Sequence, residues 1–138
     1  MKNLYTAVAT AEGGRDGRSR SLDGNLDLTM KPPKDLGGPG GGTNPEEVLA
    51  VGWAACFQNA MHTLAKIQKK EITDSSVTCE ISLMYDEEGR SVSLAARILA
   101  TIPELPEAEA RELLHATHKV CPYSKATVGN IPVELVLE

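Results

Sequence analysis

The 138-residue sequence is poor in aromatic side chains and in cysteine, and it carries no excess of positive charge. Its five aromatic residues are one Trp, three Tyr and one Phe, so the core must rest on aliphatic side chains. The formal net charge is −5, and no basic stripe is present to neutralise phosphates, which argues against a nucleic-acid-binding surface. No apolar run approaches the roughly 20 residues that span a bilayer, so no membrane partner is expected.

The sequence also lacks the features of an exported, disulfide-stapled protein. Residues 1–8 have neither the long apolar core nor the small-residue cleavage site of a signal peptide, and a cytoplasmic protein is expected. In a reducing compartment three cysteines are not a structural disulfide set, and an odd number leaves at least one thiol unpaired. The length fits one domain over residues 1–138, large enough for a core without staples.

Hydrophobic patterning predicts a mixture of strands and helices without strict β-α-β alternation, which favours the α+β class. Strands are predicted at residues 4–9, at 21–28 as a hairpin with its two-residue turn at Asp23-Gly24, at 76–85, at 91–99 and at 131–137. Gly13 to Gly17 is predicted to form a turn around Arg15, and residues 31–43 an irregular loop.

Two main helices are predicted. The first has Asn44 as N-cap and Pro45 as its first residue, and it runs to about Lys69. Because residues 48–65 are apolar on nearly every side, we expect this helix to be buried on all faces, with a partner subunit covering the outer one. The second begins at Pro106 and stops near Cys121, since the residue before a proline disfavours helix.

Two isolated cysteines raise the question of redox chemistry. Cys56 lies in the apolar first helix and Cys121 at a helix end beside Pro122, and neither belongs to a Cys-x-x-Cys motif or a metal knuckle. A thiol attacks as its thiolate, and apolar surroundings raise its pKa, so Cys56 needs a nearby cation. Arg15, restrained in its glycine-flanked turn, is the candidate cation, and Glu46 could pair with it in bidentate fashion.

Helix geometry limits how these groups can meet. Ten residues separate Glu46 from Cys56, about 15 Å along a straight helix at 1.5 Å per residue. Arg15 must therefore bridge the two, or Arg15 and Glu46 must arrive from a second chain.

The sequence resembles the OsmC/Ohr family, in its organic hydroperoxide resistance branch, over essentially the whole chain. The resemblance is carried, in order, by Gly13-Gly14-Arg15-Asp16-Gly17, by the glycine-rich residues 36–46 ending at Glu46, by Ala54-Ala55-Cys56, and by residues 120–127 around Cys121-Pro122-Tyr123-Ser124. It implies an OsmC-like fold with an antiparallel or mixed sheet and two main helices, assembled as an intertwined homodimer with active sites at the interface.

The resemblance further implies a thiol peroxidase that reduces organic hydroperoxides to alcohols without metal, haem or flavin, and that takes electrons from dihydrolipoyl groups. By position, Cys56 matches the peroxidatic cysteine, Cys121 the resolving cysteine, Arg15 the thiolate-activating arginine and Glu46 its carboxylate partner. Cys79 falls outside this set and is expected to fill the core. The apolar residues Val51, Trp53, Phe57 and Met61 would favour alkyl or fatty-acyl peroxides over hydrogen peroxide.

Other interpretations stay open from sequence alone. Each of the four site residues has an ordinary role available: a core thiol, a helix-end residue, a solvated turn arginine and a carboxylate at a helix N-terminus. His115, His118 and Cys121, spaced three apart, could instead bind a metal ion, although no fourth ligand is evident. A third class is a non-catalytic carrier of apolar ligands, whose binding would survive replacement of Cys56 by Ser.

Overall fold

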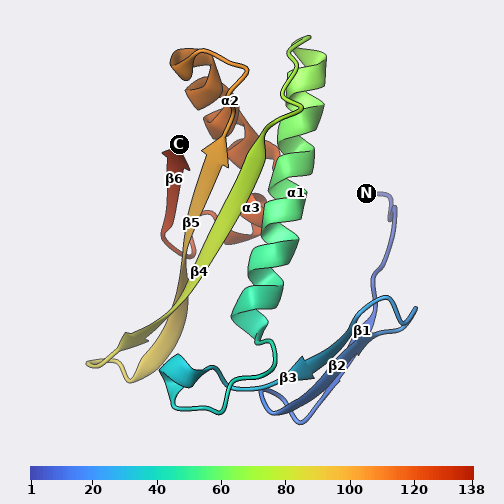
Figure 1. The fold of residues 1–138 in the computed structure, drawn as a ribbon, viewed down its shortest axis with the longest axis vertical. Helices are drawn as coiled ribbons and strands as arrows, with labels where there is room; N and C mark the ends of the chain where they lie inside the picture. Colours follow the sequence, from blue (N-terminus) through green and yellow to red (C-terminus); the bar gives the residue numbers. More distant parts are fainter. The chain divides into compact units, whose positions relative to one another are not determined.

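The computed structural model describes residues 1–138, which divide into two compact units, Met1–Val48 and Leu49–Glu138. Each unit contains its own three-stranded sheet (Figure 1), and helices occur beside strands throughout, so the α+β prediction is confirmed. The single domain over residues 1–138 stays a prediction. No helix of the protein combines the length and the apolar character that crossing a bilayer requires.

The first unit is built on an antiparallel sheet of β1 (Ala9–Glu12), β2 (Gly17–Ser21) and β3 (Asp27–Met30) in that order. The prediction of a strand at residues 4–9 is wrong, because the first strand begins only at Ala9. The register is fixed by the partner, since Ala9 pairs with Ser21, the last residue of β2. Beyond that pair a single further bond joins the Leu22 N–H to the Val8 carbonyl at 2.8 Å.

The predicted turn around Arg15 is confirmed, and its glycines have two different functions. Gly13 and Gly14 have φ of 79° and 59°, and the Asp16 N–H donates to the Gly13 carbonyl at 3.1 Å. Gly17 allows close approach instead, because a Cβ there would lie 2.0 Å from the Glu12 carbonyl oxygen. The hairpin therefore presents Arg15 at its tip in a backbone that side-chain-bearing residues would strain.

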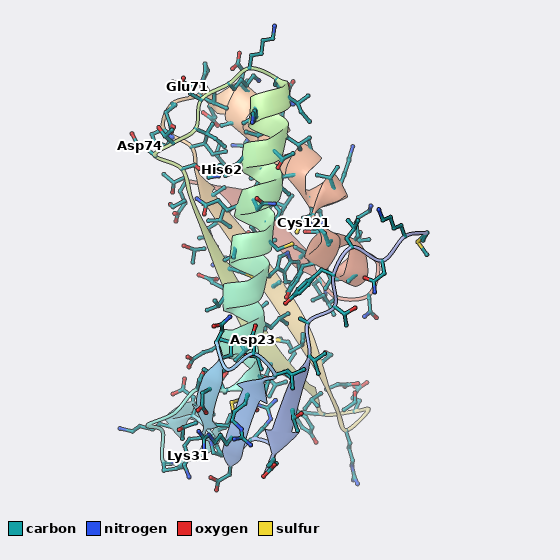
Figure 2. The ribbon with its side chains drawn as sticks, turned by 90° about the vertical axis from the view of Figure 1, so that its right-hand side faces the viewer. Asp23, Lys31, His62, Glu71, Asp74 and Cys121 are labelled. Atoms are coloured by element: carbon teal, nitrogen blue, oxygen red, sulfur yellow. The ribbon has the colours of Figure 1, made fainter.

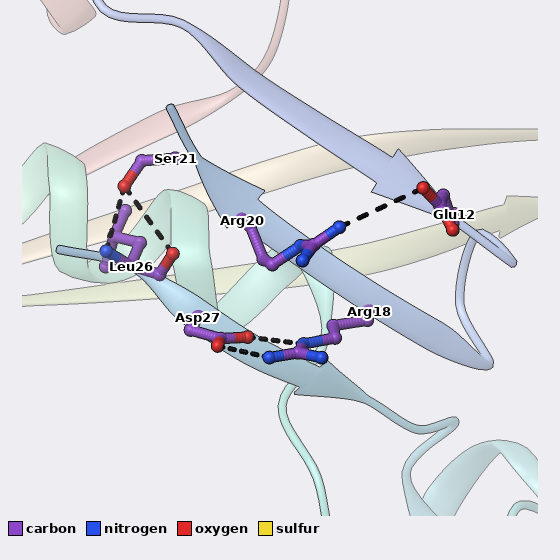
Figure 3. A network of polar contacts seen from close by, with 6 residues as sticks. All are labelled: Glu12, Arg18, Arg20, Ser21, Leu26 and Asp27. Carbon is purple, nitrogen blue, oxygen red and sulfur yellow. Dashed lines mark hydrogen bonds and ion pairs between the residues drawn. The ribbon is translucent and has the colours of Figure 1, made fainter. Parts of the chain in front are cut away.

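Charged pairs cover one part of this sheet, as Figure 3 shows: Arg18 with Asp27, and Arg20 with Glu12 at 4.0 Å. The hairpin predicted over residues 21–28 is confirmed, but its two-residue turn is wrong. The Ser21 N–H donates to the Leu26 carbonyl at 2.9 Å, which leaves a four-residue loop, 22–25. Side-chain bonds to Asp23 stabilise the longer loop, including one from the Asn25 N–H at 2.9 Å.

The loop that follows is irregular apart from one short 3-10 turn, Lys34–Leu36. Helix α1 (Pro45–Ile67) then begins as predicted, since the Asn44 side-chain oxygen accepts the Glu47 N–H at 2.9 Å. It ends two residues before the predicted Lys69, which takes a positive φ of 57°. The boundary between the two units falls in the first turn of α1.

The second unit packs helices on one face of a mixed sheet. Strands β4 (Ser76–Asp86) and β5 (Ser91–Thr101) form a long antiparallel hairpin, and β6 (Val133–Leu137) adds in parallel to β5 at the edge. Helix α2 (Glu107–Val120) stops before Cys121 as predicted, but a further short helix, α3 (Pro122–Thr127), was not predicted. Pro122 ends one helix and occupies the first position of the next, where its missing N–H costs nothing.

The core of this unit lies between the helices and β5. One stripe of α1, every fourth residue, supplies Trp53, Phe57, Met61 and Ala65, all essentially inaccessible to solvent. In the single chain α1 is buried on one side only, because Val51 on the opposite side is 72% exposed, and the expectation that a partner subunit covers this outer face stays a prediction. Only the side of α1 that meets the core is covered in this arrangement.

Candidate thiol site

The second unit brings Cys56 and Cys121 together. Cys56 lies in the middle of α1, and Cys121 stands at the junction of α2 and α3, where its N–H donates to the Thr117 carbonyl at 2.9 Å. The two sulfur atoms are 3.8 Å apart across a sequence separation of 65 residues. Figure 2 shows Cys121 beside the middle of α1. Cys121 is fully buried, whereas Cys56 is partly exposed, and both are free thiols.

The surroundings of Cys56 do not by themselves favour a thiolate. Burial is the largest influence and raises the pKa of Cys56, and the neighbouring Cys121 raises it further. A hydrogen bond from the backbone N–H of Tyr123 acts in the opposite direction and lowers this pKa. None of these influences is a cation, so activation of the thiol requires a positive charge from outside this shell.

Two contacts that sequence reasoning missed hold α3 against α1. The Trp53 indole N–H donates to the Ser124 hydroxyl at 3.2 Å, between side chains with no solvent exposure. Gly52 leaves room for the neighbouring aromatic ring, because a Cβ there would lie 2.9 Å from the Tyr123 hydroxyl. The available sequence signal was the only Trp of the chain, since a buried indole N–H needs an acceptor.

The apolar surroundings expected of Cys56 are arranged differently from the prediction. Trp53, Phe57 and Met61 are fully buried in the core rather than exposed beside the thiol, and Val51 is turned to solvent. Cys56 itself packs against that core. The apolar character near the thiol is therefore that of the core edge and not of an open lining of α1 side chains.

Arg15 and Glu46 form a bidentate pair within the first unit. The guanidinium donates from Nη1 to Oε2 at 2.8 Å and from Nη2 to Oε1 at 2.6 Å. This hydrogen bonding lowers the pKa of Glu46 and raises that of Arg15, which favours the ionised form of both groups. The pair uses two of the five guanidinium N–H donors and leaves three for another acceptor.

The third cysteine lies apart from this chemistry. Cys79 is on β4, opposite Ile98 of β5, and packs against the core as the sequence predicts. Burial raises the pKa of Cys79 to about 11, which keeps it protonated at neutral pH. A thiol that stays protonated in this way is a poor nucleophile.

The alternative interpretation as a metal site loses its basis in the structure. No group of three His, Cys, Asp or Glu side chains in the chain is arranged to hold a metal ion, so His115, His118 and Cys121 do not form one. Burial instead lowers the pKa of His118, whose Nδ1 atom is buried without a hydrogen-bond partner.

Comparisons of the sequence with known proteins all point to one family. The family model described as OsmC-like protein matches residues 38–136. The organic hydroperoxide resistance protein of Xanthomonas axonopodis pv. citri is 44% identical, with 99% of this chain and 96% of the relative covered. The organic hydroperoxide resistance protein OhrB of Bacillus subtilis is 42% identical, with 98% of each covered.

Solved structures agree with the sequence comparisons. A crystal structure of an organic hydroperoxide resistance protein from Legionella pneumophila is 43% identical, with a TM-score of 0.94 and 99% of each chain covered. The crystal structure of Bacillus subtilis OhrB is 42% identical, with a TM-score of 0.90, covering 99% of this chain and all of that one.

Proposed function

This chain belongs to the OsmC/Ohr family, and we propose that it is a cysteine-based peroxidase which protects against organic hydroperoxides by reducing them to alcohols. The names of its 42–44% identical relatives support a role in organic hydroperoxide resistance. The proposed place of action is the cytoplasm, where reducing thiols regenerate such an enzyme.

The observation that carries the proposal is the 3.8 Å separation of the Cys56 and Cys121 sulfur atoms. A disulfide needs an S–S distance of about 2.0 Å, so the two sulfurs must approach by roughly 2 Å to bond. Cys56 is partly exposed and can contact a substrate, whereas Cys121 is buried next to it.

In the proposed first step the Cys56 thiolate attacks one oxygen of the hydroperoxide. The O–O bond breaks, Cys56 becomes a sulfenic acid, and the alkoxide takes up a proton to leave as the alcohol. Arg15 supplies the positive charge that the shell of Cys56 lacks, and Glu46 orients the guanidinium through the bidentate pair. The spare guanidinium donors suit both the thiolate and the oxygen on which charge develops.

In the proposed second step the Cys121 thiol condenses with the sulfenic acid, releasing water and forming the Cys56–Cys121 disulfide. A dihydrolipoyl dithiol then reduces this disulfide by exchange, leaving a lipoyl disulfide and two free thiols. No metal, haem or flavin takes part in this sequence of bonds made and broken.

Steady-state turnover with a dihydrolipoyl reductant tests the whole proposal. We expect reduction of an alkyl hydroperoxide, and loss of two thiols per chain after one equivalent of peroxide without reductant. An apolar core edge beside Cys56 supports a preference for alkyl or fatty-acyl peroxides, so hydrogen peroxide should be the poorer substrate. Equal rates with both would remove that preference, and unchanged thiol counts would remove the function itself.

Replacing Cys121 separates the formation of the disulfide from the reaction of Cys56 with the peroxide. We expect Cys121→Ser to reduce the first equivalent of peroxide at near wild-type rate, because Cys56 remains. Without a resolving thiol the sulfenic acid persists and oxidises to sulfinic acid, so turnover should decay by about tenfold over repeated cycles. Intact-mass measurement at rising peroxide doses checks this, and a variant that resists overoxidation like the wild type would contradict it.

We also propose that the protein acts as a homodimer, with the exposed side of α1 at the interface. Val51, 72% exposed in the single chain, is the expected contact, because an apolar helix face that the chain leaves uncovered is typical of an association surface. We expect Val51→Asp to shift the protein to monomer. Val92→Asp is the matched control, since Val92 is 64% exposed on the β4–β5 hairpin.

Light scattering after size exclusion measures both variants. Equal masses for Val51→Asp and the wild type would contradict an interface on this side of α1.

A further inference from the structure

Cys121 and the first turn of α3 approach α1 through three residues that are close together in the sequence. The Cys121 sulfur lies 3.8 Å from that of Cys56, and the Ser124 hydroxyl accepts from the indole of Trp53 at 3.2 Å. Between them in the sequence, the backbone N–H of Tyr123 is near enough to Cys56 to lower the pKa of its thiol. The contacts of Cys121 and Tyr123 concern the reactive sulfur directly. The contact of Ser124 lies behind them in the core and has no part in the chemistry proposed above.

Geometry links the contact of Ser124 to the other two. Trp53 and Cys56 are three residues apart on α1, so their side chains are neighbours on one side of the helix. Tyr123 and Ser124 are adjacent in the first turn of α3, which begins at Pro122, the residue after Cys121. A bond between Trp53 and Ser124 therefore joins the part of α1 that carries Cys56 to the turn that carries Tyr123 and follows Cys121.

Because both partners are buried, breaking this hydrogen bond would leave them without a replacement partner. Trp53 and Ser124 both have no solvent exposure, so no bulk water can replace either partner if they separate. An unsatisfied buried donor is costly, and the indole N–H has only one hydrogen to give. The other α3 side-chain bonds, from the Thr127 hydroxyl to the Tyr123 and Ser124 carbonyls, stay within the helix.

We propose that Trp53 and Ser124 are positioning residues of the thiol site, whose buried hydrogen bond holds the first turn of α3 so that the Tyr123 N–H and the Cys121 sulfur both face Cys56. Its meaning for catalysis rests on the proposed peroxidase function, whereas its effect on the Cys56 thiolate does not. When the bond is lost, the N–H donor moves from the sulfur and Cys121 takes longer to reach the sulfenic acid.

The test uses the full chain with Ser124→Ala, Trp53→Phe and the double variant. Trp53→Phe keeps an aromatic ring and removes the N–H, so it serves even if Ser124→Ala folds poorly. Alkylation of Cys56 by iodoacetamide is followed against pH, with peptide mapping to separate the three cysteines. We expect about tenfold less Cys56 thiolate at neutral pH in each single variant, because a donor to a charged sulfur is lost.

A second readout is disulfide formation after one equivalent of an alkyl hydroperoxide, which we expect to be about tenfold slower because Cys121 is no longer held in place. In both assays the double variant should match the single ones, because all three lack the same bond. Additive effects in the double variant would overturn the proposal.

Thr117→Val is the matched control. Thr117 is as buried as Ser124, and its hydroxyl donates to the Leu113 carbonyl at 2.7 Å within α2. Its loss should lower thermal stability without moving the alkylation profile. If Ser124→Ala and Trp53→Phe also leave that profile unmoved, the positioning role is overturned. A shifted profile in a protein whose wild type turns over no peroxide would support positioning and remove the peroxidase function alone.

Discussion

Replacing Cys56 with Ser should reduce organic hydroperoxide turnover by at least about a thousandfold, because a serine hydroxyl is neither ionised nor a soft nucleophile at neutral pH. No other thiol can take over. Cys121 is fully buried, and Cys79 has a pKa raised to about 11. The measurement is steady-state peroxide consumption with a dihydrolipoyl reductant, together with a sulfenic-acid trap on the peroxide-treated protein.

Cys79→Ala is the matched control for this variant. It removes a thiol of similar partial burial from the same core, and it should leave turnover within about twofold of the wild type. A carrier of apolar ligands would give the opposite pattern, since its ligand binding would survive Cys56→Ser. Retained peroxide turnover in Cys56→Ser would therefore end the peroxidase proposal.

Replacing Arg15 with Ala should lower turnover by about a hundredfold, comparable to the loss of one preorganised electrostatic contact in other enzymes. The shell of Cys56 contains burial, a thiol and one N–H donor but no cation, so the guanidinium is the missing contribution. A cation stabilises the thiolate and lowers its pKa. Its removal should therefore move the pH profile of Cys56 alkylation to higher pH.

Arg18→Ala is the matched control for Arg15. Arg18 also forms a forked pair with a carboxylate, that of Asp27, and it lies on β2, the strand that follows the turn of Arg15. We expect it to leave both turnover and the alkylation profile unchanged. Glu46→Gln should fall between Arg15→Ala and the wild type, because an amide still accepts one hydrogen bond but no longer holds the guanidinium at both nitrogens. An Arg15→Ala profile identical to the wild type would remove Arg15 from the mechanism.

Mixed dimers decide which chain supplies the arginine. Cys56→Ser chains keep Arg15, and Arg15→Ala chains keep Cys56. If Arg15 acts across the interface, the mixed dimer contains one intact site and activity returns to a substantial fraction of the wild type. Mixtures that stay inactive would mean that Arg15 serves the Cys56 of its own chain.

Local chemistry in the sequence predicted several elements correctly. Asn44 and Pro45 fixed the start of α1, because capping and a proline-set φ act within one turn. Alternation of apolar residues predicted β4. The predictions that were wrong depended on partners: residues 4–9 have strand-compatible composition, yet β1 begins only where β2 offers a partner. The sequence pattern does not predict the short α3, because a proline after a helix marks the end of that helix and can equally occupy the first position of a new one.

In the candidate site, too, local chemistry predicted some residues, and others depend on contacts between distant segments. Residue types and motif order identified Cys56, Cys121, Arg15 and Glu46 as candidates, since the need of a thiolate for a cation and of a cation for a carboxylate follows from the side chains themselves. Residue types do not identify Tyr123 and Ser124 as part of the site, because their contributions are a backbone N–H and a buried acceptor.

By itself, the sequence determined the class of the fold, the family, the ends of the main helix to within two residues, and the kinds of chemical group available for catalysis. Only the tertiary structure decided that two sulfurs 65 residues apart stand 3.8 Å from each other, which side of α1 is buried, and which indole holds the turn behind them. Capping, turns and side-chain alternation are short-range properties that a few neighbouring residues fix. Contacts between distant segments depend instead on how whole elements pack, and no local pattern contains that information.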